Sequence, residues 1–329
     1  MRYVGIDHGS RAFRVAIVDP DAPSAGSPAP DTGGRVLRRE FPREKGVAGD
    51  IATLLSSDDR VVMSYSMGDA IDSFVPCSVA PRRGVRSDAG AGRFVGAGAS
   101  LVDLVSDLVA SCHLAPGLHR DVRSLDPRFR TLYSHCGSGE NVLAAFHTMV
   151  THALQTFVLA DVSTNTVSLL VREGRVVGGI DAALGAPGLH QGPLDLDAIR
   201  AAERLGAGAA FDRGGVLERP AVDDAGAPPV TGSGKAGCDD TRLDALALAV
   251  AMEIAGLLVL GDVEAVVLTG WGPEENPCLV DAIADHLGLD VLVTHRFSAA
   301  EGGALAALAI HEGAGEILGI PVVPGPDDV

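Results

Sequence analysis

The stretch VGIDHGSRAFRVAIVD, residues 4–19, contains the pattern that decides the fold. An apolar run ends at Asp7, the polar residues His8, Gly9 and Ser10 interrupt it, and a second apolar run begins two positions later. Two apolar runs joined by a short polar segment are typical of a β-hairpin. The sequence therefore predicts a hairpin whose first strand ends in an aspartate.

The second half of the chain repeats this order in the stretch FVLADVSTNTVSLLV, residues 157–171. Its first apolar run ends at Asp161, a polar turn covers Ser163 to Asn165, and a return strand follows from Val167. The residues barely match those of the first stretch, but the shared order indicates an internal duplication at the level of pattern. Elsewhere, predicted strands alternate with predicted helices, which is typical of α/β layers.

Length and composition exclude several classes of protein. A chain of 329 residues suggests about two domains. The formal charge of −17 excludes a broad basic face for nucleic acid, and the two lysines, Lys45 and Lys235, do not form a P-loop motif. The apolar segments are shorter than the ~20 residues that span a bilayer, so we expect a cytoplasmic protein that contacts no membrane. Five cysteines without ligand spacing are expected to be free thiols in a reducing compartment.

The two predicted hairpins carry residue types that can hold nucleotide phosphates. Backbone N–H groups and hydroxyls contact phosphate oxygens, whereas an aspartate repels them unless a divalent cation lies between. We therefore predict that Asp7 and Asp161 bind Mg²⁺ and that the two turns grip Mg-ATP from both sides. Each hairpin taken alone also fits an ordinary turn, because Asp and Gly are common in turns. The predicted nucleotide contacts in the hairpins are Gly9, Ser10, Arg14, Asp161, Ser163, Asn165 and Thr166.

A third element adds to the two hairpins. The predicted strand Val266 to Thr269 opens into Gly270, Trp271 and Gly272, and a helix is predicted from Asn276. Glycines leave the backbone uncovered, so a nucleoside can lie against it with little side chain in the way. We predict nucleotide contacts at Gly270, Gly272 and Asn276.

The actin-like ATPase superfamily has phosphate, adenosine and connecting-helix motifs that this chain resembles in VGIDHGSRAFRVAIVD, FVLADVSTNTVSLLV, VVLTGWGPEEN and SAAEGGALAALAI. That superfamily includes acetate and sugar kinases, heat-shock chaperones and actin. The resemblance spans most of the chain and implies an α/β fold of two ribonuclease H-like lobes, each a mixed sheet flanked by helices. It also implies Mg²⁺ and ATP in a cleft between the lobes. We place the lobes at residues 1–139 and 140–329, with a helix over 301–312 bridging them.

A narrower resemblance, to the archaeal methanogenesis marker protein 12 group, is carried by GIDHGS, SYSMGDAI, VSTNTVSLLVREGRVVGGIDA, HQGPLDLDAIR and EGGALAALAIHEGAGEILGI. That group is similar to predicted butyrate kinases. The resemblance implies an archaeal, methanogen source and an ATP-dependent activity. Two features depart from the superfamily: the second hairpin lacks a Gly-Gly turn, and Arg11 stands where sugar kinases place a small hydroxyl residue.

The resemblance also implies catalytic and acceptor residues. Sugar kinases of the superfamily carry their base at the start of a helix before the second phosphate hairpin, and Glu140 matches that place. A carboxylate at a helix N-terminus stays charged and can accept a proton, although Glu140 also fits a simple cap. Asp69 and Asp181 each follow a strand and are placed in the cleft wall, Asp181 with a catalytic role and Asp69 on the acceptor side, although both also fit turns. Arg11 and His190 are placed on the acceptor side, and a hydrogen-bonded structural role is the alternative for His190.

The function expected from these residues is ATP-dependent phosphotransfer to a small acceptor, with a short-chain carboxylate favoured. Asp7 counts among the catalytic residues as a metal ligand, and Glu140 or Asp181 assists if the acceptor is a hydroxyl; a carboxylate acceptor needs no base. The alternative is an ATPase switch that activates or chaperones a partner metalloenzyme in methanogenesis. The expected partner is thus a small-molecule acceptor or a protein, and a homodimer is left open.

Overall fold

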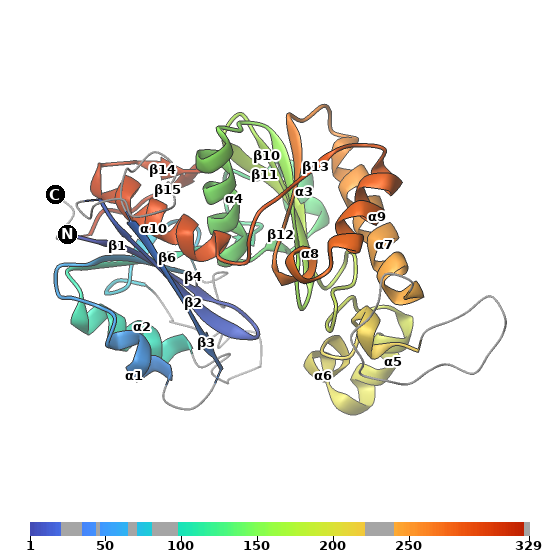
Figure 1. Cartoon of the computed structure of the whole chain (residues 1–329), viewed down its shortest axis with the longest axis horizontal. Coiled ribbons are helices and arrows are strands. Elements are labelled where there is room, and N and C mark those ends of the chain that lie inside the picture. Colours follow the sequence, from blue (N-terminus) through green and yellow to red (C-terminus); the bar gives the residue numbers. More distant parts are fainter. Residues whose placement is uncertain (21–34, 44–46, 65–70, 81–97, 221–239, 326–329) are drawn as a thin grey trace. The chain divides into compact units, whose positions relative to one another are not determined.

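The computed structural model describes residues 1–20, 35–43, 47–64, 71–80, 98–220 and 240–325 (Figure 1). These residues form mixed α/β elements that divide into two compact units. The first unit comprises Met1–Gln155, Val171–Gly178 and Phe297–Val329, and the second comprises Thr156–Leu170 and Gly179–Arg296. The predicted domain boundary after residue 139 stays a prediction. None of the described helices is both long and apolar enough to cross a membrane.

The first unit contains a six-stranded mixed sheet with the order β3-β2-β1-β4-β6-β5. β1 pairs in parallel with β4 and β4 with β6, whereas β2 is antiparallel to both β1 and β3. All residues of β1 are buried, as expected for a central strand covered on both faces. The strands are β1 (Tyr3–His8), β2 (Ala12–Asp19), β3 (Arg35–Pro42), β4 (Arg60–Ser64), β5 (Val75–Pro76) and β6 (Ser111–Ala115).

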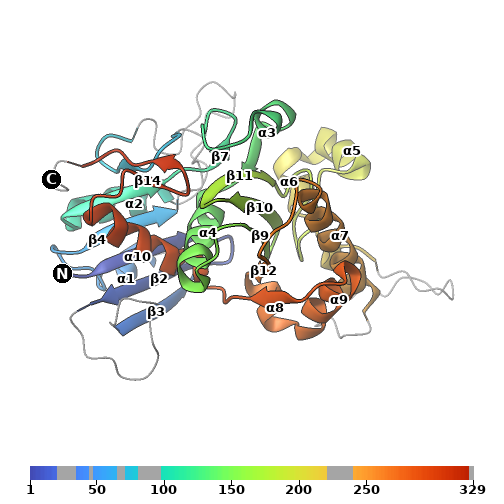
Figure 2. The same ribbon diagram turned by 90° about the horizontal axis from the view of Figure 1, so that it is seen from above.

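The first unit also contains five helices among the described residues and two small two-stranded sheets (Figure 2). The helices are α1 (Val47–Ala52), α2 (Gly98–Leu108), α3 (Pro127–Leu132), α4 (Gly139–His152) and α10 (Ser298–His311). The small sheets pair β7 (Leu118–His119) with β8 (His135–Gly137) and β14 (Glu316–Ile317) with β15 (Ile320–Pro321).

Helices cover both faces of the first sheet. On one face, α1 and α2 share a hydrophobic core with alternate residues of β1, including Val4 and Ile6. The opposite face packs against α10, which lies beside α4. Gly5 faces α10 so closely that a Cβ there would lie 1.7 Å from the carbonyl oxygen of Ala300, so this approach requires glycine. Residues of β1 with odd numbers, Asp7 among them, therefore share the face that α10 covers.

A buried acid in α10 ties this helix to its neighbours. Glu301 accepts a hydrogen bond from the Arg38 guanidinium of β3, and its Oε2 lies 3.4 Å from Nε2 of His147 in α4. Glu301 and His147 are both buried. Buried acids persist when they are paired in this way, so these contacts help to fix α10 across the first sheet.

The second sheet has the order β11-β10-β9-β12-β13. β12 is parallel to both β9 and β13. Its strands are β9 (Phe157–Val162), β10 (Thr166–Arg172), β11 (Arg175–Ile180), β12 (Ala265–Thr269) and β13 (Val291–Val293). The helices of the second unit are α5 (Leu196–Leu205), α6 (Ala207–Phe211), α7 (Thr241–Leu258), α8 (Trp271–Glu275), α9 (Pro277–Leu287) and a short 3₁₀ helix over Val216–Glu218.

The two sheets correspond strand for strand. The order β3-β2-β1-β4-β6 of the first matches β11-β10-β9-β12-β13 of the second. In each, the strand that carries the predicted aspartate lies between its hairpin partner and a parallel neighbour. This confirms the internal duplication that the sequence predicts.

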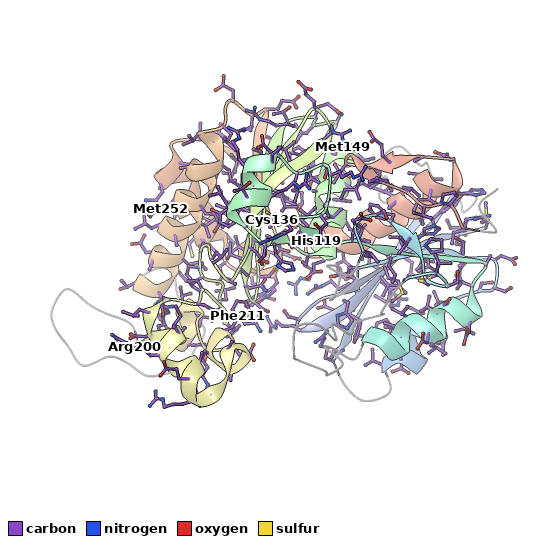
Figure 3. All side chains as sticks on the ribbon, turned by 180° about the vertical axis from the view of Figure 1, so that it is seen from behind. His119, Cys136, Met149, Arg200, Phe211 and Met252 are labelled. Atoms are coloured by element: carbon purple, nitrogen blue, oxygen red, sulfur yellow. A yellow bond between two sulfur atoms is a disulfide. The ribbon has the colours of Figure 1, made fainter. Side chains whose placement is uncertain are left out.

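The long helix α7 is covered on one side. Its buried side includes Leu246 and Ile254 and packs against α9. Leu248 and Met252 are 48% and 67% exposed, and Met252 projects away from the helix in Figure 3. One acid, Glu253, lies on the buried side.

Most predicted elements are confirmed, with three differences among the described residues. Gly270 is followed by the short helix α8 before α9, where one helix from Asn276 was expected. The strands β5, β6, β7, β8, β14 and β15 and the helices α1, α3 and α6 were not predicted. The expectation of free thiols is wrong for Cys77 and Cys112, which a disulfide joins, because antiparallel pairing of β5 with β6 brings their Cα atoms to 5.5 Å. Of the other described cysteines, Cys136 and Cys278 form no disulfide.

Candidate functional site

The first predicted turn begins at a buried carboxylate. Asp7 is 3% exposed, and its Oδ2 lies 3.2 Å from Nη1 of Arg14. Its Oδ1 accepts a hydrogen bond of 3.2 Å from the Ser64 hydroxyl, which in turn accepts one of 2.7 Å from the His8 backbone N–H. Burial raises the pKa of Asp7, and the Arg14 guanidinium and the Ser64 hydroxyl act in the opposite direction.

The register of the sheet explains this network. Asp7 and Arg14 are directly opposed in the β1–β2 hairpin, so their side chains leave the same face. Ser64 ends β4, the parallel neighbour of β1, so its hydroxyl lies at the same edge of the sheet as Asp7. Arg14, predicted to contact the nucleotide, is itself buried and pairs with Asp7 and, at 3.4 Å, with Glu40. The positive charge beside Asp7 is therefore supplied by the protein.

The residues of the first turn are accessible. Gly9 is half-buried, and Ser10 and Arg11 are exposed. On the other face of the hairpin, the ring of His8 meets that of Phe13 edge to face at 4.7 Å. Burial lowers the pKa of His8 to about 4, helped by the charge of Arg43, so this imidazole is neutral at physiological pH. The turn thus offers a hydroxyl and backbone beside a neutral histidine.

The predicted base, Glu140, occupies the first turn of α4 and is half-buried. The simple capping role falls to other residues: the side chain of Asn141 accepts hydrogen bonds from the backbone N–H and the hydroxyl of Ser138. The charges of Glu140 and Asp7 both act on Arg43, which places the two predicted catalytic carboxylates in one electrostatic environment. The catalytic role of Glu140 stays a prediction.

The second predicted turn is built from hydroxyls and backbone. Asp161 is half-buried, and its Oδ1 accepts a hydrogen bond of 2.6 Å from the Ser163 hydroxyl. The Ser163 N–H donates to the carbonyl of Asn165 at 2.8 Å, which closes the turn. Thr166 is buried, and its hydroxyl donates to the carbonyl of Pro187 at 2.8 Å. Thr166 therefore has a structural contact, while Ser163 and Asn165 remain partly accessible.

The end of β12 lies directly against this turn. Thr269 is opposite Asp161 in the parallel β9–β12 pair, so the following residue, Gly270, reaches the turn itself. Gly270 has φ +96°, and a Cβ there would lie 2.3 Å from the Ser163 hydroxyl and 2.4 Å from Oδ1 of Asp161. Glycine is required here by both conformation and space. The structure thus brings together Asp161, Ser163 and Gly270, three residues that the sequence predicted separately.

The other predicted residues of this region have specific contacts. Gly272 packs against the carbonyl of Val162, and Asn276 donates from its side chain to the Gly272 carbonyl at 2.9 Å. His190 donates its backbone N–H to the carbonyl of Thr164 at 2.9 Å. Its ring stacks on Trp271 with centroids 5.8 Å apart and lies 2.8 Å from a Glu218 carboxylate oxygen. His190 therefore borders the second turn.

Asp181 begins a turn after β11. Its side chain accepts from the Ala182 N–H at 2.7 Å, and its carbonyl accepts from Leu184 and Gly185, as in the alternative interpretation of this residue as a turn former. Its catalytic role stays a prediction. Asp69, predicted on the acceptor side, lies outside the described residues.

Sequence reasoning missed three polar residues that the structure brings to these regions. Ser64 was not predicted as a site residue. Arg43 gave no signal, because its position depends on how β3 returns along β2. Glu253 does have a signal in the sequence, because it is the single acid in the apolar run of residues 245–260. Burial raises the pKa of Glu253 to about 7, the charge of Asp181 adds to this, and its carboxyl accepts the Ala186 N–H.

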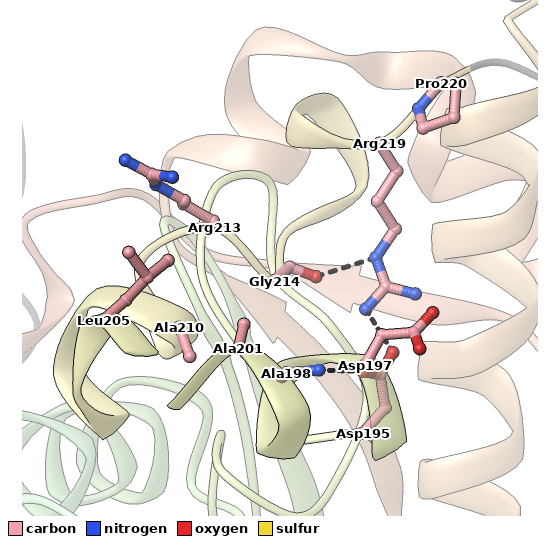
Figure 4. A pocket seen from close by; sticks show the side chains of 10 residues that line it. All are labelled: Asp195, Asp197, Ala198, Ala201, Leu205, Ala210, Arg213, Gly214, Arg219 and Pro220. Atoms are coloured by element: carbon pink, nitrogen blue, oxygen red, sulfur yellow. Dashed lines mark hydrogen bonds and ion pairs between the residues drawn. The ribbon is translucent and has the colours of Figure 1, made fainter. Parts of the chain in front are cut away.

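A cavity of 360 Å³ lies apart from these turns, within the second unit. It is bordered by α5, α6 and the segment around Arg213 and Arg219 (Figure 4). Arg219 donates to the carbonyl of Gly214 at 3.0 Å and to Asp195 at 2.9 Å. None of the residues lining this cavity belongs to the predicted site.

Solved structures share the fold of this chain. The Lmo2764 protein of Listeria monocytogenes, a candidate N-acetylmannosamine kinase, aligns with a TM-score of 0.51 and 12% identity over 94% of this chain and 99% of its own. A ROK family protein from Streptococcus pneumoniae, solved with sucrose, aligns with a TM-score of 0.50 and 11% identity over 95% of this chain and 100% of its own. The predicted actin-like ATPase fold is thereby confirmed.

Sequence relatives come from methanogenic archaea. A UPF0285 protein of Methanopyrus kandleri is 36% identical over 97% of this chain and 98% of its own length. A UPF0285 protein of Methanocaldococcus jannaschii is 35% identical over 97% of this chain and 98% of its own length. No family model matches the chain. At this identity and coverage, the chain belongs to the UPF0285 family.

Proposed function

We propose that this protein is an ATP-dependent phosphotransferase in which the turn after Asp161 binds nucleotide phosphate. The observation that carries the proposal is the contact of Gly270 with Asp161 and Ser163. It joins a hydroxyl, a carboxylate and the backbone of a buried glycine at the carboxyl ends of the parallel strands β9 and β12. The carboxyl ends of parallel strands are where open α/β sheets bind their ligands.

The metal is proposed to lie at Asp161. Carboxylate and hydroxyl oxygens are the hard donors that Mg²⁺ prefers, and Asp161 and Ser163 supply both on a partly accessible turn. Asp7 fits this role less well, because it is buried and already paired with the guanidinium of Arg14. When bound, Mg²⁺ would neutralise the charge that develops on the phosphates.

The first turn is proposed to contact phosphate through Gly9 and Ser10. Both residues are accessible, and Ser10 offers a hydroxyl. Arg14 then acts indirectly, because its guanidinium holds Asp7 and leaves the turn itself for the ligand. The ROK family kinase-like fold supports phosphotransfer as the reaction class, although a fold alone does not choose a substrate.

The acceptor is proposed to be a short-chain carboxylate. This finer part of the proposal draws on the resemblance to the methanogenesis marker protein 12 group and to predicted butyrate kinases. One carboxylate oxygen would form a bond to the γ-phosphorus while the bond from that phosphorus to the bridging oxygen breaks, giving an acyl phosphate and ADP. If the acceptor is instead a hydroxyl, its proton would pass to Glu140 or Asp181.

An acceptor screen tests this proposal. Purified full-length protein with Mg-ATP is offered acetate, propionate, butyrate and a panel of sugars, and ADP release is followed. We expect one acid to raise ADP release well above the rate with ATP alone, and Asp161→Asn to abolish that increase. The matched control is Glu203→Gln on the exposed side of α5, which should behave as the wild type.

The alternative, an ATPase switch for a partner enzyme, predicts a different result. Its specific support is Asp7, which is tied to Arg14 where a phosphotransferase site would present a free carboxylate. A switch should hydrolyse ATP slowly with every acid and sugar, and a methanogen cell extract should accelerate it. That outcome would overturn the kinase proposal.

A further inference from the structure

Arg43 lies over the first hairpin although it is far from it in sequence. Strand β3 returns along β2, with Phe41 opposite Phe13, so the residue that follows Pro42 comes back over the turn. The guanidinium carbon of Arg43 is 5.4 Å from the centroid of the Phe13 ring. Its Nη2 lies 2.8 Å from Nδ1 and 3.0 Å from Nε2 of His8.

These contacts fix the guanidinium while leaving most of its donors available. Stacking on Phe13 uses the face of the group, and the hydrogen bond to His8 uses one N–H. A ring nitrogen of His8 is the acceptor in this bond, because a guanidinium only donates. An arginine has five N–H donors in a planar fork, Arg43 is an exposed residue, and its described hydrogen bonds all use Nη2.

Among the described residues, no carboxylate contacts the Arg43 guanidinium directly. Asp7 is held by Arg14 at 3.2 Å, and no carboxylate of the described residues lies within ion-pair distance of Arg43. Asp7 and Glu140 act on it from farther away and raise its pKa, although partial burial has the larger, opposite effect. A partly desolvated, fixed cation attracts anions more strongly than a free surface arginine does.

We propose that Arg43 is an oxyanion-binding residue of the first unit, which takes a phosphate oxygen of the nucleotide or a carboxylate oxygen of the acceptor. His8, to which it is bonded, directly precedes the turn residues Gly9 and Ser10. The planar fork suits either oxyanion, because both present two oxygens to parallel N–H donors. The identity of the ligand rests on the proposed function, whereas the binding of an anion does not.

A purely structural role for Arg43 makes a different prediction. If the side chain only covers Phe13 and His8, its loss should lower stability and leave the response to anions unchanged. Arg43→Gln removes the charge, and Arg43→Lys keeps the charge but loses the planar fork. Arg39→Gln is the matched control, since Arg39 is an exposed arginine of the same strand region that bonds only the neighbouring Arg38 carbonyl among the described contacts.

The first experiment needs no nucleotide. Inorganic phosphate and sodium acetate are titrated separately into the full chain while the ring signals of His8 are followed by NMR. We expect a saturable shift with at least one of the two anions, and weaker binding by about 10- to 100-fold in Arg43→Gln, the range for a lost hydrogen bond to a charged group. A shift with phosphate alone would identify the nucleotide as the source of the oxyanion. A shift with acetate alone would identify the acceptor as the source. Equal responses in Arg43→Gln and Arg39→Gln, or no response in the wild type, would overturn the inference.

The second experiment separates this inference from the proposed function. Turnover of Mg-ATP is measured in the same variants, with melting curves to confirm that each is folded. We expect Arg43→Gln to lower turnover by about 10- to 100-fold, Arg43→Lys to recover part of it, and Arg39→Gln to match the wild type. If the wild type turns over ATP and Arg43→Gln does so equally, the role of Arg43 is refuted and the proposed function stands. If the wild type uses no ATP, the proposed function fails and the anion titration alone decides on Arg43.

Discussion

The two hairpins share a position in their sheets but differ in chemistry. In each hairpin, the turn follows an aspartate near the end of the first strand. That strand has a parallel neighbour, which is β4 for β1 and β12 for β9. Asp7 is buried and held by the guanidinium of Arg14 and the hydroxyl of Ser64. Asp161 is half-buried and bonded to the hydroxyl of Ser163, with Gly270 against it.

This difference teaches that one sequence pattern can serve two tasks. A carboxylate that a buried arginine already neutralises is suited to holding the hairpin together. A carboxylate on a partly accessible turn of hydroxyls and backbone is suited to binding a metal and a phosphate. The duplicated pattern thus predicts where both aspartates lie, while their neighbours determine what each can do.

The largest effect is expected for stability when Asp7 is changed. Asp7→Asn leaves the guanidinium of Arg14 buried without its main partner, which should cost about 3–5 kcal/mol of unfolding free energy. Asp161→Asn should cost about 1 kcal/mol, because it replaces a charge-assisted hydrogen bond by a neutral one at a partly accessible site. Urea denaturation compares the two variants.

A double variant checks the cause of that loss. Asp7→Asn combined with Arg14→Met removes both charges and should recover much of the stability. Equal losses in Asp7→Asn and Asp161→Asn, or no recovery in the double variant, would remove the difference between the hairpins.

The two substitutions should affect ATP turnover in the opposite order, with the larger loss in Asp161→Asn. Asp161→Asn removes the proposed metal ligand and should lower ATP turnover by on the order of a hundredfold or more. The folded fraction of Asp7→Asn should keep a higher turnover than this, because Asp7 holds Arg14 and not the metal. Steady-state ADP release at saturating Mg²⁺ measures both. A greater loss of turnover per folded molecule in Asp7→Asn would show that the proposed roles are exchanged.

The buried acid Glu253 should make stability depend on pH. Its pKa is raised from 4.5 in the unfolded chain to about 7 in the folded protein, so the folded state favours the protonated form. The contribution of this pKa shift to the free energy of unfolding is therefore fully present below pH 4.5. It is lost as the pH rises through 7, and the total loss is about 3 kcal/mol. Glu253→Gln, which cannot ionise, should be more stable than the wild type at pH 8 and similar to it near pH 4.5. Denaturation at both values tests this, and an unchanged difference between them would refute it.

The smallest difference is expected between substitutions of two glycines. Gly270 and Gly288 both have positive φ, but only Gly270 has neighbours within reach of a Cβ. Gly288→Ala should cost about 1–2 kcal/mol from conformation alone. Gly270→Ala should cost about 1–3 kcal/mol more and should also weaken ATP binding, because its methyl would displace Ser163 and Asp161. Melting curves and nucleotide titration of both variants check this, and equal behaviour would mean that Gly270 does not shape the turn.

The sequence predicted much of the fold because local patterns determine its strands and long helices. The apolar runs that end at Asp7 and Asp161 are strand signals, and the strand predicted over Val266 to Thr269 is found as β12, which begins one residue earlier. The two-residue strands β5, β7, β14 and β15 were missed because they are too short for a period to appear. The Cys77–Cys112 disulfide was missed because it depends on the pairing of β5 with β6.

The candidate site could be predicted only in part. Asp161, Ser163 and Gly270 follow predicted strands, and parallel pairing brings them together. The pairing of Arg14 with Asp7 and the position of Arg43 depend on strand register, which a single sequence does not determine. Arg14 was predicted to contact the nucleotide, whereas in the structure its guanidinium forms ion pairs with Asp7 and Glu40.

Calorimetric titration of the full chain with Mg-ATP tests the central proposal most directly. We predict saturable binding to one site per chain in the wild type, retained by Glu203→Gln and weakened at least about tenfold by Asp161→Asn and by Gly270→Ala. Absence of binding by the wild type, or equal affinity in Asp161→Asn, would contradict the role proposed for the second turn.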